Sequence, residues 1–584
     1  MSSHSKRGLG SLADDASSLD ALLRPIGGLS HVKGETVRPL IEKTIPDLLC
    51  ETVRRFGERD ALISVHQQIR LTWREFSNEV DALARGLVML GLAKGDRLGI
   101  WSPNTVEWVL TQFATARIGV ILVNINPAYR LSELEYALNK AGCVALVTAP
   151  SFKSSDYIGM LNRLAPELAG STPGEIRAAR LPALRTIIRL GSERTDGMLN
   201  FAEVVERGRA GTDIDLDRLG RALDRNDPIN IQFTSGTTGA PKGATLTHRN
   251  LVNNGDNVTT RMLFTEADRL CIPVPLYHCF GMSMGTLGCV TKGAAMVFPG
   301  EGFEPAATLK AVEQERCTGL YGVPTMFLAM LDAPDFGGYD LTSLRTGIMA
   351  GAPCPIEVMK RVIDRMHMDE VTIAYGMTET SPVSFQSHTS DPVDKRVATV
   401  GRVHPHIEVR IVDPGGAVLP VGEAGELCTK GYSVMSGYWD DEENTKHAIT
   451  PDGWMHTGDL ATIDEDGYAA IVGRVKDMVI RGGENIYPRE VEEFLYRHPK
   501  ISDVQVFGIP DEKYGEELCA WIVVKAGETL SEEEVKAFCE DEISHFKIPR
   551  FVRFRETLPM TVTGKPQKFL MRRAMIEEMG LAGE

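Results

Sequence analysis

Phe233-Thr-Ser-Gly-Thr-Thr-Gly-Ala-Pro-Lys-Gly243 is a segment rich in hydroxyl side chains and glycine that contains a single lysine. It follows Ile229–Phe233, in which apolar and polar residues alternate as in a β-strand. Gly236, Gly239 and Gly243 allow positive φ angles and a close approach of the backbone to an anion. Consecutive backbone N–H groups in such a turn bind anions. The segment therefore predicts a phosphate-binding loop, and the alternative is a flexible Ser/Thr/Gly linker.

The candidate phosphate contacts of this loop are hydroxyl-bearing residues, glycines and one lysine: Thr234, Ser235, Gly236, Thr237, Thr238, Gly239 and Lys242. A linker would need neither the preceding strand nor a lysine inside the turn, so we favour the phosphate-binding loop. Pro241 stands before the lysine, where the common P-loop pattern has glycine. A P-loop NTPase is therefore the weaker hypothesis.

Length, charge and cysteine usage limit the classes of protein to consider. A chain of 584 residues exceeds one hydrophobic core, so several domains are expected. The net charge of −16 argues against nucleic acid as the main partner. The ten cysteines form no C-x-x-C pair, which suits free thiols in a reducing cytoplasm. We expect no membrane insertion, because the best apolar stretch, Val106–Ile125, contains Glu107 and Arg117.

Strand and helix signals alternate through most of the chain. Arg97–Trp101 reads as a strand, Asn104–Arg117 as a helix, and Val120–Ile125 as a buried strand. Ser132 and Glu135 have the spacing of a capping box that would open a further helix. Such alternation predicts an α/β fold in which doubly wound parallel sheets carry helices on both faces.

Three domains are expected. Residues 1–35 begin Ser-rich and without an apolar run, which predicts a disordered tail. Residues 36–475 would form the large N-terminal domain, with a β-rich subdomain at about 398–475 where Pro/Gly turns separate short strand signals. Residues 476–584 would form a small α+β C-terminal domain, in which Ser531 and Glu534 have capping-box spacing.

Two further motifs carry carboxylates suited to a nucleotide. Thr378 and Glu379 follow a predicted strand and would point into the crevice where open α/β sheets bind ligands. Glu379 beside a phosphate loop is a candidate Mg²⁺ ligand, and the alternative is charge compensation at a helix N-terminus. Asp459, after Thr457-Gly458, could accept hydrogen bonds from ribose hydroxyls or form a simple Asx-turn.

The C-terminal part contains a local excess of positive charge. Lys547 to Arg573 hold eight basic residues and one acidic residue, Glu556, in a chain that is acidic overall. Thr563-Gly564 predicts a turn that would present Lys565 on an exposed tip. Such a reversal of charge indicates contact with an anion. The alternative, compensation of a helix dipole, covers only the last arginines of this stretch.

Five motifs, in this order along the chain, resemble those of the adenylate-forming superfamily, which includes acyl-CoA synthetases, luciferases and peptide-synthetase adenylation domains. They are Thr234–Gly243, Tyr375–Glu379, Thr457–Asp459, Gly473–Lys476 and Gly564–Lys565. The resemblance spans residues 45 to 573. It is strongest to the medium- and long-chain fatty acyl-CoA synthetases, through Asn126–Leu134 and Tyr375–Phe385.

The resemblance implies a reaction in two steps. A carboxylate attacks the α-phosphorus of MgATP to give acyl-AMP and pyrophosphate, and the thiol of coenzyme A then takes the acyl group and releases AMP. Thr234 to Lys242 would hold the β- and γ-phosphates. Lys565 would bridge the carboxylate and the α-phosphate as negative charge gathers.

The other nucleotide contacts come from three short segments. The resemblance implies that Tyr375 stacks on adenine, that Thr378 contacts the α-phosphate, and that Asp459 and Arg474 hold the ribose. Its remaining nucleotide-site positions are Gly351, Ala352, Pro353, Gly376 and Met377.

A hinge, a coenzyme A site and an acyl pocket are also implied. Lys476 matches the family's pivot, about which the C-terminal domain would rotate between the two steps. Gly482, Gly483 and Glu484 would then replace Lys565 beside the pantetheine tunnel. The expected acyl pocket consists of Tyr277, His278, Phe280, Met282, Val323 and Met377. Its large apolar side chains favour an aliphatic or aromatic acid over acetate, although each could be ordinary core.

Other functions remain as alternatives. Within the superfamily they are an aryl-acid CoA ligase, a luciferase-like oxidase and an adenylating enzyme that loads a carrier protein. Outside it, a non-catalytic nucleotide-binding protein is disfavoured because Glu379, Asp459 and Lys565 are all present. The oligomeric state is open, and a homodimer is one candidate.

Overall fold

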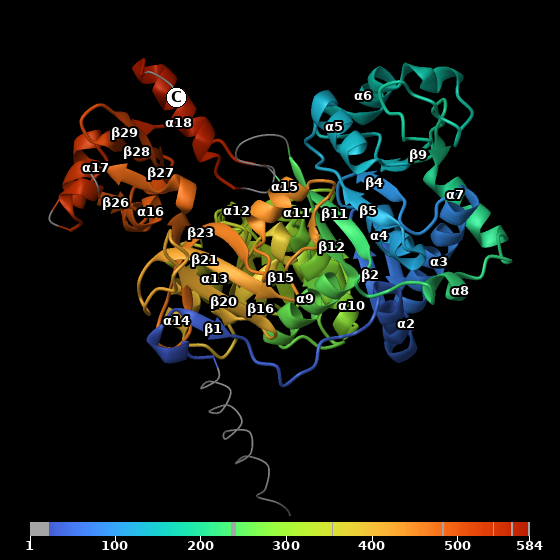
Figure 1. Ribbon diagram of the computed structural model, residues 1–584, viewed down its shortest axis with the longest axis horizontal. Helices are drawn as coiled ribbons and strands as arrows, with labels where there is room; N and C mark the ends of the chain where they lie inside the picture. The colour runs from blue at the N-terminus through green and yellow to red at the C-terminus, as the bar shows by residue number, and fades with distance from the viewer. Residues whose placement is uncertain are drawn as a thin grey trace, which may run out of the picture.

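The computed structural model describes residues 23–234, 241–352, 354–481, 484–540, 542–561 and 565–581, and every structural statement below concerns these residues. Two large sheets and a five-stranded sheet form the main body, and the last hundred residues form a separate smaller body at its side (Figure 1). This arrangement confirms the expected α/β class with a small C-terminal domain.

The first large sheet has eight strands in the order β10-β9-β6-β4-β5-β11-β12-β22. Its first six strands pair in parallel, and β12 and β22 are added antiparallel at the edge. The strands are β4 (Arg97–Trp101), β5 (Ile121–Asn124), β6 (Ala145–Thr148), β9 (Thr186–Arg189), β10 (Leu199–Asn200), β11 (Pro228–Thr234), β12 (Lys242–Thr247) and β22 (Gly437–Tyr438).

The second large sheet has nine strands in the order β19-β18-β17-β16-β15-β13-β14-β2-β3. Along β14, Met296 and Phe298 belong to one core and Val297 to the other, as the two-residue period of a strand requires. The strands are β2 (Asp60–Ser64), β3 (Ile69–Thr72), β13 (Arg269–Cys271), β14 (Ala295–Phe298), β15 (Gly319–Gly322), β16 (Thr346–Ala350), β17 (Glu370–Gly376), β18 (Val383–Gln386) and β19 (Arg402–Val403).

Helices fill the space between and around these sheets. Helix α9 (His248–Arg261) contacts both β12 of the first sheet and β18 of the second, and 11 of its residues are buried. Both sheets therefore pack against the same buried helix. The other helices are α2 (Ile45–Phe56), α3 (Trp73–Met89), α4 (Val106–Ile118), α5 (Leu131–Ala141), α6 (Tyr157–Leu164), α7 (Phe201–Ala210), α8 (Leu216–Gly220), η3 (Phe280–Leu287), α10 (Gly288–Lys292), α11 (Pro305–Glu315), α12 (Pro324–Leu331), α13 (Ile356–Met366), α14 (Val393–Ala398) and α15 (Glu442–Ala448).

A five-stranded antiparallel sheet completes the main body in the order β1-β20-β21-β23-β24. Its strands are β1 (His31–Lys33), β20 (Ile407–Val412), β21 (Gly425–Gly431), β23 (Met455–Ile463) and β24 (Ala469–Arg474). The expected tail over residues 1–35 is wrong for its last part. His31 to Lys33 pair with β20, because the edge of that sheet offers free backbone groups, and Val32 is fully buried.

The C-terminal domain has a core of its own, built on one mixed sheet. It begins after the short helix η6 (Val475–Asp477) and consists of β25 (Val479–Arg481), β26 (Glu484–Ile486), α16 (Pro488–Leu495), β27 (Ile501–Asp511), β28 (Gly515–Val524), α17 (Glu532–Cys539), β29 (Phe551–Phe554) and α18 (Lys568–Met579). In the described part of the chain, no helix has the length and apolar character needed to cross a membrane.

Two local predictions about helix starts had different outcomes. Ser531 and Glu534 cap α17 as expected, since each side chain bonds to the other's backbone N–H. The capping box at Ser132 and Glu135 is wrong. Helix α5 begins one residue earlier, and Glu133 accepts a 2.9 Å bond from the backbone N–H of Arg130. Glu133 lies three residues after Arg130, so the same spacing rule is met two positions ahead of the predicted pair.

Candidate active site

The two large sheets meet where β11 and β17 end. Thr234, the last residue of β11, donates from Oγ1 to Oε1 of Glu379 at 3.2 Å, although 145 residues separate them in sequence. Glu379 lies in η5 (Thr378–Thr380), which follows β17 directly, and Thr378 and Glu379 are both buried. The predicted phosphate and magnesium motifs are therefore neighbours at the strand ends. Ser235, Gly236, Thr237, Thr238, Gly239 and Pro353 lie outside the described residues.

Glu379 also accepts a hydrogen bond that its sequence context did not reveal. The hydroxyl of Tyr438, on β22, donates to the same Oε1 atom at 3.0 Å. The Lys242 ammonium lies 5.2 Å from the centre of the Tyr438 ring. Among the described residues, no lysine or arginine forms an ion pair with Glu379. Both hydroxyl donors, from Thr234 and Tyr438, bond to Oε1 of Glu379.

Asp459 is bonded to residues of two other predicted nucleotide motifs, Tyr375 and Arg474. The hydroxyl of Tyr375 donates to its Oδ2 at 2.6 Å, and Nε of Arg474 lies 3.1 Å from its Oδ1. Arg474 faces Asp459 directly across the β23–β24 pair, which brings residues 15 positions apart together. Burial, together with the neighbouring carboxylate of Asp459, raises the pKa of Tyr375 well above its usual value. Tyr375 therefore remains a neutral donor.

Lys565 of the C-terminal domain lies at this same site. It is partly buried, so the expected exposed tip is wrong. Burial and the positive charge of Arg474 lower its pKa, and the nearby Asp459 and Glu379 carboxylates oppose that shift. Its backbone N–H donates to Oγ1 of Thr561 at 2.9 Å, which anchors its segment. The structure thus brings Lys565 to within electrostatic range of both carboxylates from more than a hundred residues away.

His278 lies near Lys565, at the start of the predicted acyl region. Burial and the positive charge of Lys565 lower the pKa of His278 to about 3, so its imidazole is neutral. Its Nδ1 accepts a 3.2 Å bond from the backbone N–H of Phe280. Phe280 opens η3, a π-helix, a rare form often found at functional sites.

The other predicted acyl residues come from three elements. Phe280 and Met282 of η3 are buried, as is Val323 before α12, while Tyr277 and Met377 are partly exposed. Their burial agrees equally with an acyl pocket and with ordinary core, so the pocket remains a prediction.

Backbone constraints account for two glycines of the nucleotide motifs. A Cβ atom on Gly376 would lie 1.7 Å from the carbonyl oxygen of Pro382, so only glycine fits at this bulge between β17 and β18. Gly351 follows β16 with φ of +87°, the left-handed region that favours glycine, and Ala352 follows it. Both positions keep the backbone close to the predicted adenine site.

The predicted hinge residue lies between the main body and the C-terminal domain. Lys476 is in the middle of η6, between β24 of the five-stranded sheet and β25 of the C-terminal domain. Glu484 begins β26 and is exposed, whereas Gly482 and Gly483 lie outside the described residues. Lys565 is near Asp459 and Glu379.

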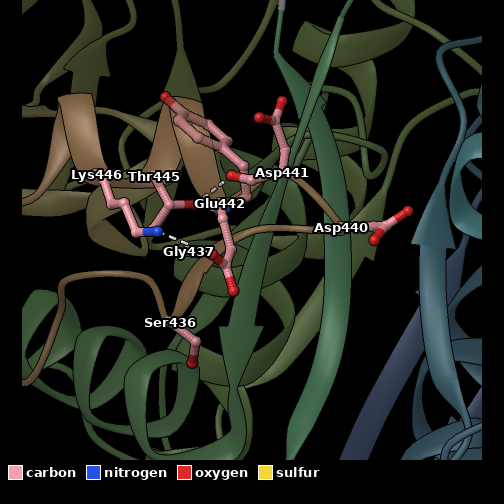
Figure 2. Close-up of a pocket in the computed structure, with 8 residues that line it drawn as sticks. Ser436, Gly437, Asp440, Asp441, Glu442, Thr445 and Lys446 are labelled. Carbon is pink, nitrogen blue, oxygen red and sulfur yellow. Dashed lines mark hydrogen bonds and ion pairs between the residues drawn. The ribbon is translucent and has the colours of Figure 1, made fainter.

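A surface depression of about 620 Å³ lies beside Tyr438, over β22 and α15 (Figure 2). Three carboxylates line it, from Asp440, Asp441 and Glu442, against the single ammonium of Lys446. An acidic lining repels polyphosphate, so we do not assign this depression to ATP.

The family models match most of the main body and most of the C-terminal domain. The model described as AMP-binding enzyme covers residues 49–439, and that of the AMP-binding enzyme C-terminal domain covers residues 490–565. The chain belongs to the AMP-binding enzyme family. The resemblance to adenylate-forming enzymes stated from the sequence is confirmed.

Known members of the AMP-binding family cover almost the whole chain. The YngI protein of Bacillus subtilis, whose assignment as an acyl-CoA synthetase is itself provisional, is 49% identical over 93% of this chain and 99% of its own. The mitochondrial medium-chain acyl-CoA ligase ACSF2 of Homo sapiens is 46% identical over 95% of this chain and 91% of its own.

Solved structures agree in fold. The anthranilate CoA ligase AuaEII in complex with anthranoyl-AMP is 25% identical, with a TM-score of 0.81 over 93% of this chain and 99% of its own. ATP-bound MatB from Rhodopseudomonas palustris is 28% identical, with a TM-score of 0.78 over 91% of this chain and 99% of its own.

Tyr438 is the contact that sequence reasoning missed. It lies 59 residues from Glu379, in a Gly-Tyr-Trp segment without any catalytic signature. Only the antiparallel pairing of β22 with β12 brings it to the site.

Proposed function

We propose that this protein activates a medium- or long-chain fatty acid as acyl-AMP, releases pyrophosphate, and transfers the acyl group to coenzyme A. The enzyme class, an AMP-forming acyl-CoA synthetase, rests on two family domains and on relatives aligned over more than nine-tenths of the chain. The acid and the residue roles are our proposal.

One observation carries the proposal: Lys565 lies near Arg474, Asp459 and Glu379 although it belongs to the other domain. A cation between these groups can neutralise the negative charge that gathers when a carboxylate attacks the α-phosphate. Nucleotidyl transfer depends mainly on such positioning and neutralisation. The geometry therefore corresponds to the first step of the reaction.

The remaining nucleotide roles follow the contacts already described. Asp459 accepts hydrogen bonds from the ribose hydroxyls, and Arg474 holds its carboxylate in place. Tyr375 stacks on adenine through its ring while its hydroxyl is bonded to Asp459. Thr234 and Lys242 flank the loop that holds the β- and γ-phosphates, and Thr378 contacts the α-phosphate.

The donor set around Glu379 fits a magnesium ion. Its carboxylate is buried, and within the described part of the chain the donors to its Oε1 are the neutral hydroxyls of Thr234 and Tyr438. A buried carboxylate without a cationic partner is costly, and Mg²⁺ prefers such oxygen ligands. When bound, the ion would neutralise charge on the phosphates. Glu379 holds it, and Thr234 and Tyr438 orient the carboxylate.

The second step requires Lys565 to leave the site. Lys476, in the short η6 segment, is the proposed pivot, and its rotation would bring Glu484 of β26, with Gly482 and Gly483 before it in the sequence, toward the thiol. His278 is neutral and lies at the carboxylate end of the proposed acyl pocket.

The proposed substrate, location and assembly rest on the following observations. Apolar side chains at Phe280, Met282 and Val323, and the medium-chain name of ACSF2, favour a fatty acid. An aryl acid is the second candidate, because the structurally similar AuaEII binds anthranoyl-AMP. All ten cysteines are free thiols, which suits the cytoplasm, and a homodimer remains open.

ATP–pyrophosphate exchange over a panel of fatty and aromatic acids tests the proposal, followed by thioester assays with coenzyme A and with a carrier protein. We expect exchange with medium- or long-chain fatty acids and product only with coenzyme A. Exchange with aryl acids alone would show that the substrate is an aryl acid and not a fatty acid. Product formed only on a carrier protein would show that the acceptor is not coenzyme A. The absence of exchange with any acid would overturn the proposed activity.

A further inference from the structure

Strand β23 contains a two-residue bulge at the point where it carries Asp459. Glu426 of β21 pairs with Leu460, and Cys428 pairs with His456. Between these pairs β21 has one residue, Leu427, whereas β23 has three, Thr457, Gly458 and Asp459. The ladder is therefore interrupted over Thr457–Asp459, and the backbone groups there need other partners.

Side chains replace the missing ladder bonds. Oε1 of Glu426 accepts the backbone N–H of Gly458 at 3.1 Å. Oγ1 of Thr457 donates to the carbonyl of Leu427 at 2.7 Å and accepts the N–H of Asp459 at 3.1 Å. Gly458 has φ of +70°, the left-handed region that favours glycine, directly before Asp459. The bulge thus has a defined shape, set by Glu426 and Thr457.

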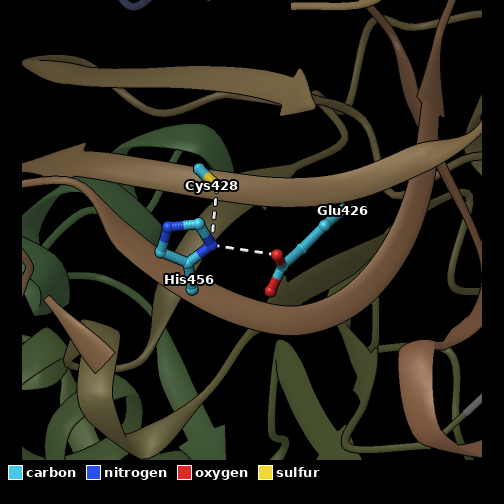
Figure 3. Close-up of side chains that lie close together, drawn as sticks. All are labelled: Glu426, Cys428 and His456. Carbon is cyan, nitrogen blue, oxygen red and sulfur yellow. Dashed lines mark hydrogen bonds and ion pairs between the residues drawn. The ribbon is translucent and has the colours of Figure 1, made fainter. Parts of the chain in front are cut away.

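His456 holds the second oxygen of Glu426. Its Nδ1 lies 2.9 Å from Oε2, and because an ionised carboxylate is only an acceptor, Nδ1 carries the hydrogen (Figure 3). The Glu426 carboxylate therefore bonds to both neighbours of Thr457, to the side chain of His456 and to the backbone N–H of Gly458. Both of its oxygens have directed donors, which limits the rotation of its side chain.

We propose that Glu426, supported by His456, is a positioning residue that aims the Asp459 carboxylate at the ribose of ATP. The inference rests on the ribose-binding role of Asp459 given under Proposed function. Glu426 does not touch Asp459, Tyr375 or Arg474 directly. It acts through the backbone N–H of Gly458, the residue immediately before Asp459.

A metal site is the other reading of this group. Ligand atoms of Glu426, Cys428 and His456 lie within 4.8 Å of one another. Both oxygens of Glu426 are already accounted for by N–H donors, however. Burial, followed by the Glu426 carboxylate, also raises the pKa of Cys428 to about 12, so its thiol is protonated in the metal-free protein. Hydrogen bonding alone explains the arrangement.

The test compares ATP with 2′-deoxy-ATP in pyrophosphate exchange, because a misdirected Asp459 loses the ribose contact specifically. We expect Glu426→Ala to lower kcat/KM for ATP by about tenfold to a hundredfold, the range for a lost bond to a charged group, with a much smaller loss for 2′-deoxy-ATP. The ratio of kcat/KM for ATP to that for 2′-deoxy-ATP measures the discrimination between the two nucleotides. Glu426→Gln keeps an oxygen acceptor for the N–H of Gly458 and should restore most of this discrimination.

Glu408→Ala is the matched control. It removes another Glu–His pair of the same sheet, in which Oε1 of Glu408 lies 2.6 Å from Nε2 of His31, without any contact to the bulge. We expect its discrimination between the two nucleotides to equal that of the wild type. Equal losses in Glu408→Ala and Glu426→Ala would show general destabilisation and overturn the inference.

Asp459→Ala separates this inference from the proposed function. If Asp459→Ala removes the discrimination and Glu426→Ala does not, only the positioning role is wrong. If Asp459→Ala itself leaves the discrimination unchanged, the ribose assignment is wrong and the inference falls with it. Stoichiometric zinc that is present in the wild type and lost in Glu426→Ala would also overturn it, because Glu426 would then be a metal ligand.

Discussion

The hydroxyl of Tyr375 donates a 2.6 Å hydrogen bond to Oδ2 of Asp459, which joins the nine-stranded sheet to the five-stranded sheet. Tyr375 is near the end of β17, and Asp459 lies in the bulge of β23. The proposed adenine and ribose contacts are therefore one hydrogen-bonded unit, and a change in either should affect how the other binds the nucleotide.

Tyr375→Phe should weaken ATP binding moderately. The variant keeps the aromatic ring but leaves Asp459 with Arg474 alone, so we expect kcat/KM for ATP in pyrophosphate exchange to fall about tenfold. Tyr339→Phe is the control, because its exposed hydroxyl bonds to Asp335 at 2.7 Å, away from the site. No loss in Tyr375→Phe, or an equal loss in Tyr339→Phe, would contradict the role of this bond.

Tyr438→Phe should raise the magnesium concentration that adenylation requires. It removes one of the two hydroxyl donors on Oε1 of Glu379 and leaves Thr234 as the other. A magnesium titration of pyrophosphate exchange measures the effect. We expect a shift of a few-fold to about tenfold for one bond to a charged group, and near-complete loss in Glu379→Gln. An unchanged magnesium dependence in both variants would remove Glu379 from the metal site.

Lys565→Ala should abolish adenylation while sparing thioester formation from supplied acyl-AMP. Removal of one preorganised charge at a transition state typically lowers the rate about 10²- to 10³-fold. Single-turnover assays of each half-reaction separate the two effects. Equal losses in both halves would contradict the assignment. Lys568→Ala is the control. Lys568 lies three residues after Lys565, and its replacement removes an ion pair with Glu492.

The pH dependence of adenylation should show the titration of Lys565. Burial, with Arg474 nearby, lowers its pKa, so its charge and hence the adenylation rate are lost as pH rises through that lowered value. At pH values between this lowered pKa and the usual pKa of lysine, Lys565 is protonated more in the unfolded chain than in the folded protein. In this range the free energy of unfolding therefore increases as pH rises. Lys565→Arg should move the alkaline loss of rate to higher pH. An alkaline limb unchanged in this variant would assign it to another group.

Lys476→Pro should impair thioester formation selectively. Proline fixes φ near −65° and so restricts the pivot in η6. Because the structure has Lys565 at the site, we expect pyrophosphate exchange to persist while the overall rate falls. An unchanged overall rate would contradict the hinge, and comparable losses in both half-reactions would indicate a folding defect.

Local sequence determined much of the fold and the identity of the motifs. The strand at Ile229–Phe233 lies within β11, and alternating strands and helices form the expected doubly wound sheets. The positions of helices and strands follow from the short-range periodicity of hydrophobic residues, which can be read from one amino-acid sequence. The errors concern a helix start at Ser132 and the N-terminal strand β1, where a neighbouring residue or a distant sheet edge supplies the deciding hydrogen bonds.

The candidate site was predicted as a set of separate motifs, without the contacts that join them. Asp459 was identified by its Thr-Gly-Asp sequence, but its bond to Tyr375 crosses 84 residues. Lys565 was expected on an exposed tip and is instead partly buried, because its domain brings it against Arg474 and the two carboxylates.

The sequence by itself determined the candidate groups: a glycine-rich loop, two carboxylates and a lysine, each recognisable because its local residues suit a phosphate, a metal or a ribose. Tertiary structure alone decided how these groups are supported, through Tyr438 on Glu379 and through Glu426 on the backbone before Asp459. The physical reason is that hydrogen bonds depend on distance and direction in space. Pairing of β22 with β12 and of β21 with β23 sets both.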